Sequence, residues 1–214
     1  MTKSFPRTYV SAKRLRTPNC AVIYTRNDKP VLDFLSLPLI VKPVFEGNSI
    51  GITKNSVCSN FDEALLRAKD LYQKIAAPVM LEEFIDGAEV NICILGSAKS
   101  APLVNTVALN KKGLVYDYSQ KHHRISLNRY PLYNGIEVKR QIHDFLDIFS
   151  MLGKVEFMRI DCIIKNGELY CIELTPDADL SISSALYKSV SMKMTYVEFL
   201  KLIIDNSLES YRNR

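Results

Sequence analysis

A predicted β-hairpin near residue 165 carries the side chains whose chemistry is clearest in this sequence. An alternating strand over Glu156–Ile164 is followed by the turn-forming dipeptide Asn166–Gly167 and by a second strand that ends near Leu174. Asp161 lies on the first strand and Glu173 on the second. Carboxylates on adjacent strands suit a hard cation such as Mg²⁺, which takes one or two carboxylates together with phosphate oxygens and water.

The spacing between these two carboxylates predicts which side chains share a face of the hairpin. An odd number of residues separates Asp161 from Glu173, so an odd-residue loop over 165–167, with Gly167 in the left-handed conformation, puts both on one face. That face would also carry Arg159, Leu169 and Cys171, and the opposite face would carry Ile160, Cys162, Ile164, Tyr170 and Ile172. The alternative interpretation is a solvent-exposed face with an ordinary arginine–carboxylate pair.

A second chemical signal is Lys42, which lies inside the apolar strand predicted over residues 39–45. A buried ammonium group without a partner is costly, so this side chain either extends to the surface or meets an anion. The next loop, residues 46–51, could hold phosphate groups through its backbone N–H groups, although a glycine-bearing loop is more often a simple turn. Glu82 and Glu83, at the end of a later strand, are equally compatible with charges that protect a sheet edge.

Composition excludes several classes of protein. The 214 residues are 47% hydrophobic and 24% charged, which is typical of a folded globular chain and not of a disordered or membrane-embedded one. No apolar run is long enough to span a bilayer, and no signal peptide is present, so we expect a cytoplasmic protein. The net charge of +5 comes from scattered basic residues, which argues against a nucleic-acid surface and suits small anionic ligands. The five cysteines form no metal or disulfide pattern.

The elements that must position these residues predict an α+β fold. Asn60 and Glu63 form a capping box before an amphipathic helix, and two more helices are expected over 136–152 and 196–206. Further strands are expected over 21–25, 79–84, 89–95, 103–109 and 114–118. Residues 119–134 have no clear period and predict a long surface loop. Because helices and strands lack the regular alternation of a parallel sheet, the sheets should be mainly antiparallel.

Five segments, taken together, resemble the ATP-grasp fold, and most closely its D-alanine–D-alanine ligase branch. They are PLIVKPVFEGNSIG at 38–51, MLEEFIDGAE at 80–89, YDYSQK at 116–121, RID at 159–161 and ELTP at 173–176. The resemblance covers about residues 37–205. It implies a leader (1–16), a central lobe (17–89) and a carboxy-terminal lobe (90–214), two α+β lobes that clamp a nucleotide.

The resemblance also implies roles for individual residues. Lys42 and Lys121 would contact phosphates, Glu82–Ile85 would hold the adenine through backbone groups at Glu83 and Ile85, and Glu89 would bind the ribose. The full implied ATP-binding set is Lys42, Glu46, Gly47, Asn48, Ser49, Gly51, Glu82, Glu83, Phe84, Ile85, Glu89 and Lys121. The implied metal ligands are Asp161, Glu173 and Thr175, and the implied catalytic residues are Arg159, Lys121 and Ser184.

The implied activity is that of a carboxylate–amine ligase with ATP and Mg²⁺ as cofactors. A carboxylate would attack the γ-phosphate to give an acyl phosphate, and an amine would then displace phosphate to form an amide. The substrates would be small molecules, an amino acid or a short peptide, and neither nucleic acid nor membrane is expected as a partner. The alternative is a catalytically silent ATP-binding domain that acts as a regulatory or partner subunit.

Three departures from the family support that alternative. The amino-terminal domain that usually helps to hold the first substrate is almost absent, so a partner protein or a homodimer would have to supply its surface. Thr175 stands where the metal motif usually has asparagine, and a hydroxyl is the weaker Mg²⁺ ligand. Asp179 stands where the family has a glycine, and its carboxylate would repel a developing oxyanion.

Overall fold

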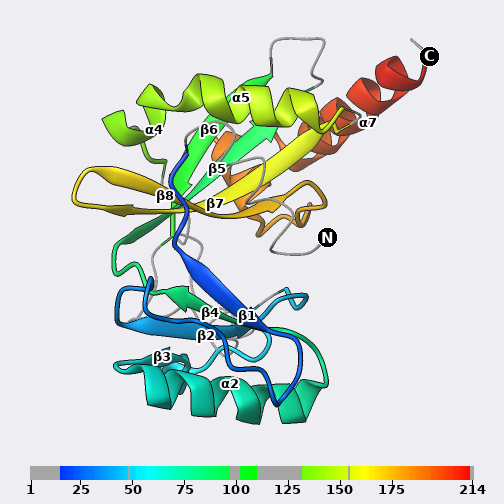
Figure 1. Ribbon diagram of the computed structural model, residues 1–214. Coiled ribbons are helices and arrows are strands. Elements are labelled where there is room, and N and C mark those ends of the chain that lie inside the picture. Colours follow the sequence, from blue (N-terminus) through cyan, green and yellow to red (C-terminus); the bar gives the residue numbers. More distant parts are fainter. Residues whose placement is uncertain (1–14, 48, 97–101, 110–131, 154, 213–214) are drawn as a thin grey trace. The chain divides into compact units, whose positions relative to one another are not determined.

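The computed structural model describes residues 15–47, 49–96, 102–109, 132–153 and 155–212. They divide into two compact units (Figure 1). Unit 1 contains the described residues of 17–86, and unit 2 contains residues 15–16 and the described residues of 87–212. Within the described part of the chain, no helix has both the length and the apolar composition that crossing a bilayer requires.

Unit 1 is a four-stranded antiparallel sheet with one long helix packed against it (Figure 1). In sheet order the strands are β1 (Cys20–Ile23), β4 (Val79–Glu83), β2 (Leu39–Pro43) and β3 (Val57–Cys58). A short 3-10 turn, η1 (Lys54–Ser56), leads into β3, and α2 (Phe61–Ile75) follows it. The helix buries Ala64, Ala68 and Leu71 in a core that it shares with the strands.

The predicted helix after Asn60 is confirmed, but its capping differs in one detail. The Asn60 side chain accepts a hydrogen bond from the Glu63 N–H at 2.9 Å, which satisfies one of the free donors of the first turn. The Glu63 carboxylate accepts from the N–H of Ser59 at 3.0 Å, one residue before the partner that a capping box uses. The helix ends at Ala76, which is left-handed and donates its N–H to the Tyr72 carbonyl.

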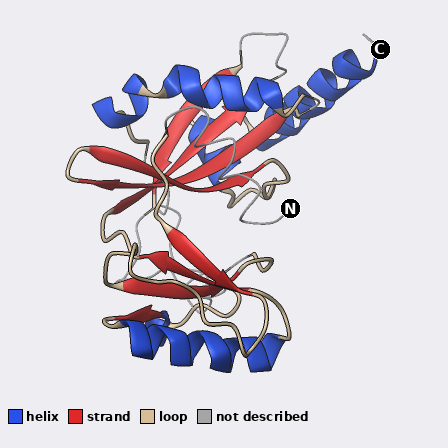
Figure 2. Cartoon of the chain, viewed as in Figure 1, coloured by secondary structure: helices blue, strands red, loops and turns tan. Residues whose placement is uncertain are grey.

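Unit 2 is a second four-stranded antiparallel sheet with helices on both faces (Figure 2). In sheet order the strands are β6 (Leu103–Ala108), β5 (Ala88–Leu95), β7 (Phe157–Lys165) and β8 (Glu168–Thr175). Helices α4 (Ile136–Arg140) and α5 (Ile142–Met151) cover one face, and α6 (Ala185–Val190) and α7 (Tyr196–Arg212) cover the other. Side chains alternate along β5, so Val90 and Ile92 belong to the first core and Cys93 to the second.

Two helices of unit 2 differ from the predicted ranges. The single helix expected over 136–152 is broken at Gln141, whose backbone leaves the helical region and whose N–H bonds the Val138 carbonyl. Both segments nevertheless pack on the same face of the sheet, where Val138 of α4 and Phe145 of α5 belong to one buried core. The last helix continues to Arg212 and not to 206.

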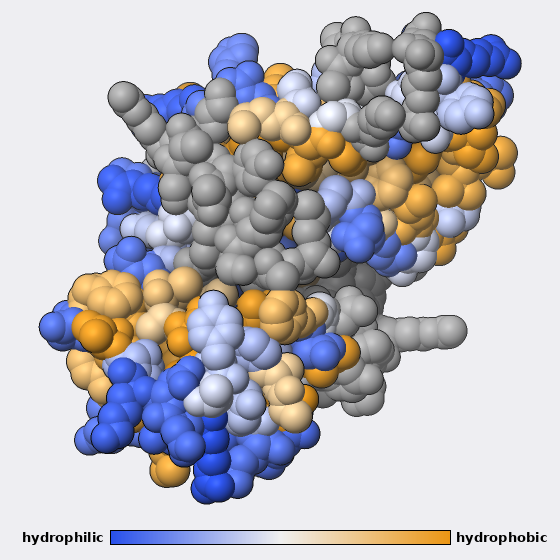
Figure 3. All heavy atoms as spheres, turned by 45° about the vertical axis from the view of Figure 1, so that its right-hand side comes forward, coloured by the Kyte–Doolittle hydropathy of each residue, from blue (hydrophilic) through white to orange (hydrophobic). Residues whose placement is uncertain are grey.

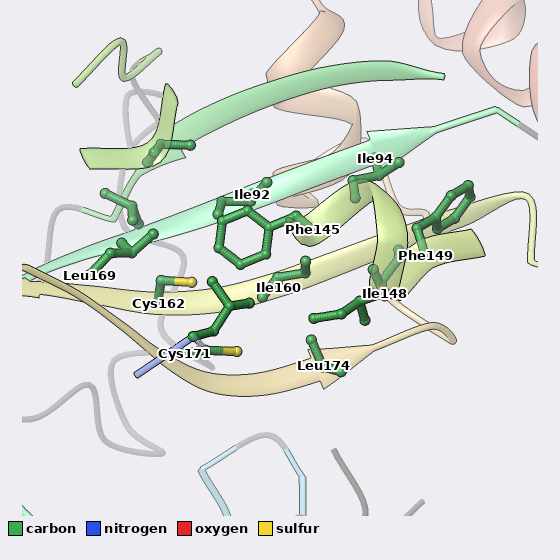
Figure 4. Close-up of a cluster of buried hydrophobic side chains, with 14 residues drawn as sticks. Ile92, Ile94, Phe145, Ile148, Phe149, Ile160, Cys162, Leu169, Cys171 and Leu174 are labelled. Carbon is green, nitrogen blue, oxygen red and sulfur yellow. The ribbon is translucent and has the colours of Figure 1, made fainter. Parts of the chain in front are cut away.

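The β7–β8 hairpin differs from the prediction in the length of its loop and in the face on which some residues of β8 lie. The turn has two residues, Asn166 and Gly167, both with positive φ (52° and 76°), and Lys165 pairs with Glu168. This register puts Leu169 and Cys171 in the buried core with Cys162, not on the carboxylate face (Figure 4). A β-bulge between Asp161 and Cys162 then shifts the register by one.

After this bulge Asp161 lies opposite Glu173, so the prediction that the two carboxylates share one face is confirmed although the predicted loop is wrong. All the pairings between the named strands are antiparallel, and the α+β fold class is also confirmed. The strand predicted over 114–118 lies outside the described residues. Leu15 and Arg16, from the segment expected as a leader, contact unit 2: Leu15 is in its core, and the Arg16 carbonyl accepts the Cys171 N–H at 2.8 Å.

Candidate functional site

The buried lysine of unit 1 meets an anion from its own sheet. Lys42 on β2 is 6% exposed and Glu82 on β4 is 2% exposed, and their side chains form an ion pair. In the register Ile40 lies opposite Glu82, so the two charged residues are diagonal neighbours on one face. An ammonium group carries three N–H donors, so Lys42 can bind Glu82 and a second anion together. The pairing offsets the cost of burying each charge alone.

The carboxylate of Glu83, at the end of β4, binds residues from two other segments of unit 1. It accepts hydrogen bonds from the backbone N–H of Ser36 at 2.8 Å and of Asn19 at 3.1 Å, and from the Asn19 side chain at 3.2 Å. Partial burial opposes ionisation, but these hydrogen bonds outweigh it and hold the pKa of Glu83 below its usual value. The Glu83 side chain therefore has a structural role, because it holds Asn19 and Ser36 at the end of β4.

The same hydrogen bonds determine which backbone groups near residue 83 are already used by the protein. The Glu83 N–H donates to the Asn19 carbonyl at 2.9 Å, and a regular antiparallel pair would return a bond from the Asn19 N–H to the Glu83 carbonyl. Here that N–H donates to the Glu83 carboxylate instead, so the Glu83 carbonyl does not receive it. The Phe84 N–H is used by the Pro38 carbonyl at 2.9 Å. Ile85, the next residue, is half-buried.

The loop after β2 consists of two successive turns. The Ile50 N–H donates to the Gly47 carbonyl and the Ile52 N–H donates to the Ser49 carbonyl, both at 3.0 Å. Gly51 has a φ of +78°, and a Cβ there would lie 2.8 Å from the Pro43 Cγ, so this glycine is required by the backbone. A Cβ added at Gly47 would meet no atom within 4 Å. Glu46 is half-buried, and Asn48 lies outside the described residues.

In unit 2 the predicted site residues lie on one face of the sheet, in two rows across three strands. Asp161 on β7 lies between Asn91 on β5 and Glu173 on β8. One pleat along, Arg159 lies between Cys93 and Thr175. Because Cys93 is in the core under α6 and α7, these polar residues share the sheet face that those helices partly cover.

Asp161 is held firmly by two neighbours. Arg159 donates from Nε to Oδ1 at 2.6 Å and from Nη2 to Oδ2 at 3.0 Å, and Asn91 donates from Nδ2 to Oδ1 at 2.8 Å. A carboxylate has about four lone-pair positions, so one on Oδ2 remains for another ligand. Asn91 was not among the predicted site residues, although it is the one polar residue within the apolar run Val90–Leu95.

The donor set on this face fits a hard divalent cation. Asp161 and Glu173 lie directly opposite each other. The Thr175 Oγ1 is buried and has no hydrogen-bond partner among the described residues, which leaves its oxygen lone pairs open to a ligand. Across the described ranges no three His, Cys, Asp or Glu side chains gather in a metal-binding arrangement. A bound Mg²⁺ would therefore complete its shell with phosphate and water oxygens, as this ion commonly does.

The other predicted residues of unit 2 are placed separately. Ser184 is 5% exposed and begins α6, where its Oγ accepts the Tyr187 N–H at 3.2 Å. Asp179 turns to Ser181 and accepts from its N–H and its hydroxyl, both at 2.8 Å. Glu89 lies on β5 opposite Ile163 and is half-buried. Lys121 lies outside the described residues.

Two buried thiols of unit 2, Cys93 on this face of the sheet and Cys162 on the opposite face, are poor nucleophiles. Burial raises the pKa of the Cys93 thiol to about 12. Burial, followed by the neighbouring Cys171 thiol, raises the pKa of Cys162 well above its usual value. Thiolate chemistry at either position is thus disfavoured at neutral pH.

Comparison with known proteins places this geometry in a family. Residues 15–205 match the family model described as "D-ala D-ala ligase C-terminus". The D-alanine–D-alanine ligase of Aquifex aeolicus is 28% identical over 203 residues, which cover 94% of this chain and 66% of that protein. The enzyme of that name from Cupriavidus pinatubonensis is 29% identical, with 89% and 58% covered. The chain thus spans about three fifths to two thirds of the length of these relatives.

Solved structures show the same fold at lower identity. A D-alanine–D-alanine ligase from Bacillus anthracis complexed with ATP has a TM-score of 0.73 at 19% identity, covering 99% of this chain and 66% of that one. VanG D-Ala:D-Ser ligase from Enterococcus faecalis gives 0.74 at 22%, with 96% and 61% covered. An L-amino acid ligase from Bacillus licheniformis gives 0.65 at 22%, with 97% and 47% covered. The chain belongs to the D-Ala-D-Ala ligase C-terminal family and has its ATP-grasp fold.

Proposed function

We propose that this chain is the ATP-binding and catalytic part of a carboxylate–amine ligase that forms an amide through an acyl phosphate. The observation that carries the proposal is the opposed pair of Asp161 and Glu173 beside Arg159, in a chain of this family. Neither carboxylate belongs to the apolar cores, and together they would hold a cation that neutralises phosphate groups.

In unit 1 the nucleotide would be held by charge and by backbone groups. The Lys42 ammonium, kept in place by Glu82, would bind the α- and β-phosphates. The Glu83 carbonyl would accept from the adenine amino group, and the Ile85 N–H would donate to a ring nitrogen. The diversion of the Asn19 N–H to the Glu83 carboxylate supports this assignment, because it withdraws a competing donor from that carbonyl.

The remaining ATP contacts are assigned from the family pattern. Glu89 would bind the ribose hydroxyls, the loop of Glu46–Gly51 would close over the phosphates, and Lys121 would reach the phosphates as well. The turns of the loop and the conformation of Gly51 support a backbone that can present N–H groups.

In unit 2 the residues would hold a magnesium ion and the transferred group. Asp161, Glu173 and the Thr175 hydroxyl would be its protein ligands, and the bound ion would neutralise the phosphate charge. Arg159 would orient Asp161 and stabilise the negative charge on the transferred phosphoryl group. Alignment and charge neutralisation carry such reactions, so no protein nucleophile is needed.

The bond changes are those of two successive displacements. A substrate carboxylate oxygen attacks the γ-phosphorus, and the bond to the β-phosphate oxygen breaks, which gives an acyl phosphate and ADP. An amine nitrogen then attacks the acyl carbon, phosphate leaves, and the nitrogen loses a proton. The Ser184 oxygen accepts the Tyr187 N–H, so its own O–H can donate to a substrate carboxylate.

The substrates we propose are an amino acid or short peptide as carboxylate donor and an amino compound as acceptor. The similar proteins are named for D-alanine, D-serine and L-amino acid substrates, and all three share an α-amino carboxylate. We propose that a surface contributed by a partner protein or by a second copy completes the substrate site.

A second candidate is a nucleotide-binding domain without catalysis. Two observations favour it. Arg159 donates hydrogen bonds to both carboxylate oxygens of Asp161, and the third proposed metal ligand, Thr175, is a neutral hydroxyl. A weakly held metal would still allow ATP to bind in unit 1 but would leave the γ-phosphate poorly neutralised.

The test measures ADP release from Mg-ATP with pooled D- and L-amino acids and short peptides, followed by mass spectrometry of any amide product. Glu173→Gln is compared with Glu168→Gln, which lies on the same strand but is exposed and paired with Arg16 at 2.7 Å. A ligase gives release that requires a pool and is lost only in Glu173→Gln.

Two results would contradict the proposal in different ways. Binding of Mg-ATP in calorimetry, with no amide from any pool, would favour the silent domain. A Lys42→Ala variant that binds ATP as tightly as the unchanged protein would remove the assigned phosphate contact. An amide product that depends on Glu173 would exclude the silent domain.

A further inference from the structure

The loop after β2 is anchored to the rest of unit 1 at both of its ends. At its start the Val44 N–H donates to the Pro78 carbonyl at 3.0 Å, and Val44 is buried. At its end Gly51 lies against Pro43, so closely that a Cβ on this glycine would be 2.8 Å from the proline ring. Ile50, between these two points, is exposed. The position of the loop is therefore set by the contacts at its two ends.

Thr53 follows the loop and is held by contacts from two elements. Its N–H donates to the Ser56 Oγ at 3.0 Å, and its carbonyl accepts the Ser56 N–H at 3.0 Å. Ser56 is fully buried, so these two bonds fix Thr53 within the turn η1. The Thr53 Oγ1 accepts a hydrogen bond from the Arg67 Nη2 at 3.1 Å. Through this last bond α2 reaches the end of the loop.

Arg67 is less exposed than its charged neighbours on α2. Figure 3 shows hydrophilic side chains gathered at the bottom of the view, where α2 lies. The side chains of Lys74 and Asp70 are 64% and 44% exposed, as expected for the outer side of a surface helix. The Arg67 side chain is only 25% exposed. Its guanidinium group is thus directed along the protein surface toward Thr53 and not outward into solvent.

The stability of α2 does not explain this placement of Arg67. The Arg67 Nε is buried and has no hydrogen-bond partner among the residues that the structure describes, and burying an N–H in this way costs stability. The Arg67 Nη1 lies 3.7 Å from the Asp70 carboxylate, which is closer to Lys74 at 2.9 Å. The directed bond to Thr53 is what this costly placement gains.

We propose that Arg67 is a positioning residue for the phosphates of ATP. By holding Thr53, it fixes the end of the loop after β2, so that the backbone N–H groups of the loop are directed at the β- and γ-phosphates. The inference rests on the proposed function, in which this loop closes over the phosphates. A loop that is held in place before the ligand arrives loses less conformational entropy on binding, and the affinity is higher.

The test is calorimetric titration of the full chain with ATP, ADP and AMP in the presence of Mg²⁺. Arg67→Met keeps the apolar stem of the side chain and removes the guanidinium group. We expect it to weaken ATP binding about three- to tenfold, which is the size of one lost hydrogen bond. ADP should be affected less, and AMP should bind unchanged because it lacks the phosphates that the loop would cover.

Lys74→Met is the matched control. It removes the same charge from the same helix, but Lys74 is paired with Asp70 at the surface and no hydrogen bond from its side chain to the loop is found in the described chain. We expect it to leave the affinities for all three nucleotides unchanged. An equal loss of ATP affinity in Lys74→Met would mean that long-range charge, and not the contact with Thr53, holds the phosphates.

Unfolding in urea separates positioning from a structural role. Arg67→Met also removes the buried Nε that lacks a described partner, so we expect a urea midpoint equal to or above that of the unchanged protein. A side chain with only a structural role would instead lower the midpoint and weaken ATP, ADP and AMP alike.

A double-variant cycle tests whether Arg67 acts through Thr53. Thr53→Val keeps the shape of the side chain and removes the hydroxyl, so it should weaken ATP binding as much as Arg67→Met does. The double variant should lose no more than either single variant, because the two residues share one contact. Thr53→Ser retains the hydroxyl and should bind ATP as the unchanged protein does.

Several outcomes would overturn the inference. Unchanged ATP affinity in Arg67→Met would leave the proposed function in place and remove only the role of Arg67. Equal losses for ATP and AMP, or additive losses in the double variant, would show that Arg67 does not act on the phosphates through Thr53. An unchanged protein that binds none of the three nucleotides would contradict the proposed function itself.

Discussion

The geometry around Asp161 makes Asn91 a residue that should affect the proposed metal site without itself binding the ion. Both Asn91 and Arg159 donate to the same oxygen of Asp161, which fixes the carboxylate with one position on Oδ2 left open. Groups that orient a metal ligand commonly change metal affinity by 10- to 100-fold. Asn91 is therefore the residue at which a small change should be felt by a bound cation.

We predict that Asn91→Leu weakens binding of Mg-ATP by about tenfold, because Asp161 loses one of the donors that orient it. Asn91→Asp should weaken it more, since it places a second negative charge beside Asp161. Calorimetric titration with Mg-ATP measures the effect, and titration with ATP in the presence of EDTA separates metal from nucleotide binding.

The control for this prediction is Asn206→Leu on α7, where the side-chain nitrogen is buried and has no hydrogen-bond partner among the described residues. It should leave Mg-ATP binding unchanged. If Asn91→Leu lowers the unfolding free energy but keeps the affinity for Mg-ATP, then Asn91 has only a structural role.

The lowered pKa of Glu83 leads us to expect that the folded protein loses stability as the pH becomes acidic. Hydrogen bonds from Ser36 and Asn19 lower the pKa of Glu83 below its usual 4.5 despite partial burial. A carboxyl whose pKa is lower in the folded than in the unfolded state stabilises the fold fully above the unfolded value. That contribution is lost as the pH falls below about 4.5 and through the folded value.

We therefore expect Glu83→Gln to lower the urea midpoint of unfolding at neutral pH and to reduce its fall between neutral and acid pH. Asp62→Asn, an exposed carboxylate in the first turn of α2, is the control. Parallel acid profiles for the unchanged protein and Glu83→Gln would contradict the assigned hydrogen bonds.

At the scale of elements, the hairpin shows what a sequence can and cannot predict. The face shared by Asp161 and Glu173 was predicted from their spacing, and it is confirmed. The predicted three-residue loop would have paired Asp161 with Cys171, whereas the two-residue turn and the bulge pair Asp161 with Glu173. The two registers differ by two residues at this point, which keeps Asp161 and Glu173 on one face in both. Between the turn and the bulge they differ by one residue, which is why Leu169 and Cys171 are found in the core.

Other elements were predicted where a local signal decides the structure. Asn60 gives the start of α2, and the apolar spacing of α5 gives the face that packs on the sheet. The break at Gln141 was not predicted, because no glycine or proline lies there to indicate the end of a helix. The ion pair between Lys42 and Glu82 depends on the pairing of β2 with β4, and no local pattern encodes such a non-local contact.

The two glycines of the loop after β2 differ in whether the structure could accept a side chain in their place, and this difference can be tested. Gly51 combines a φ of +78° with a 2.8 Å approach to Pro43. Gly51→Ala should lower the unfolding free energy by about 1–2 kcal/mol for the backbone strain alone. Gly47→Ala should change it by less than about 0.5 kcal/mol, since a side chain there meets nothing.

Both alanine variants keep their backbone N–H, so ATP binding reports only on the shape of the loop. We expect weaker ATP binding in Gly51→Ala and unchanged binding in Gly47→Ala, by calorimetry alongside urea unfolding. Equal stability of the two variants would mean that the turn tolerates a side chain at Gly51.

At the scale of the whole molecule, the apolar side chains form separate cores that follow the two units. One buried cluster contains Leu81 and the inner face of α2, and all its members belong to unit 1. The other two clusters lie on opposite faces of the sheet of unit 2, and one of them contains Ile160. Each buried cluster therefore takes its members from one unit only, and each unit has an apolar core of its own that can unfold as a cooperative structure.

We predict two thermal transitions by scanning calorimetry in the absence of nucleotide. Leu81 and Ile160 are fully buried, so replacing either by alanine removes packing worth about 2–5 kcal/mol from one core only. Leu81→Ala should lower the temperature of one transition and leave the other in place, and Ile160→Ala should do the reverse. A single transition that both variants lower equally would mean that the separate cores unfold as one cooperative structure, and each unit would then depend on the other for its stability.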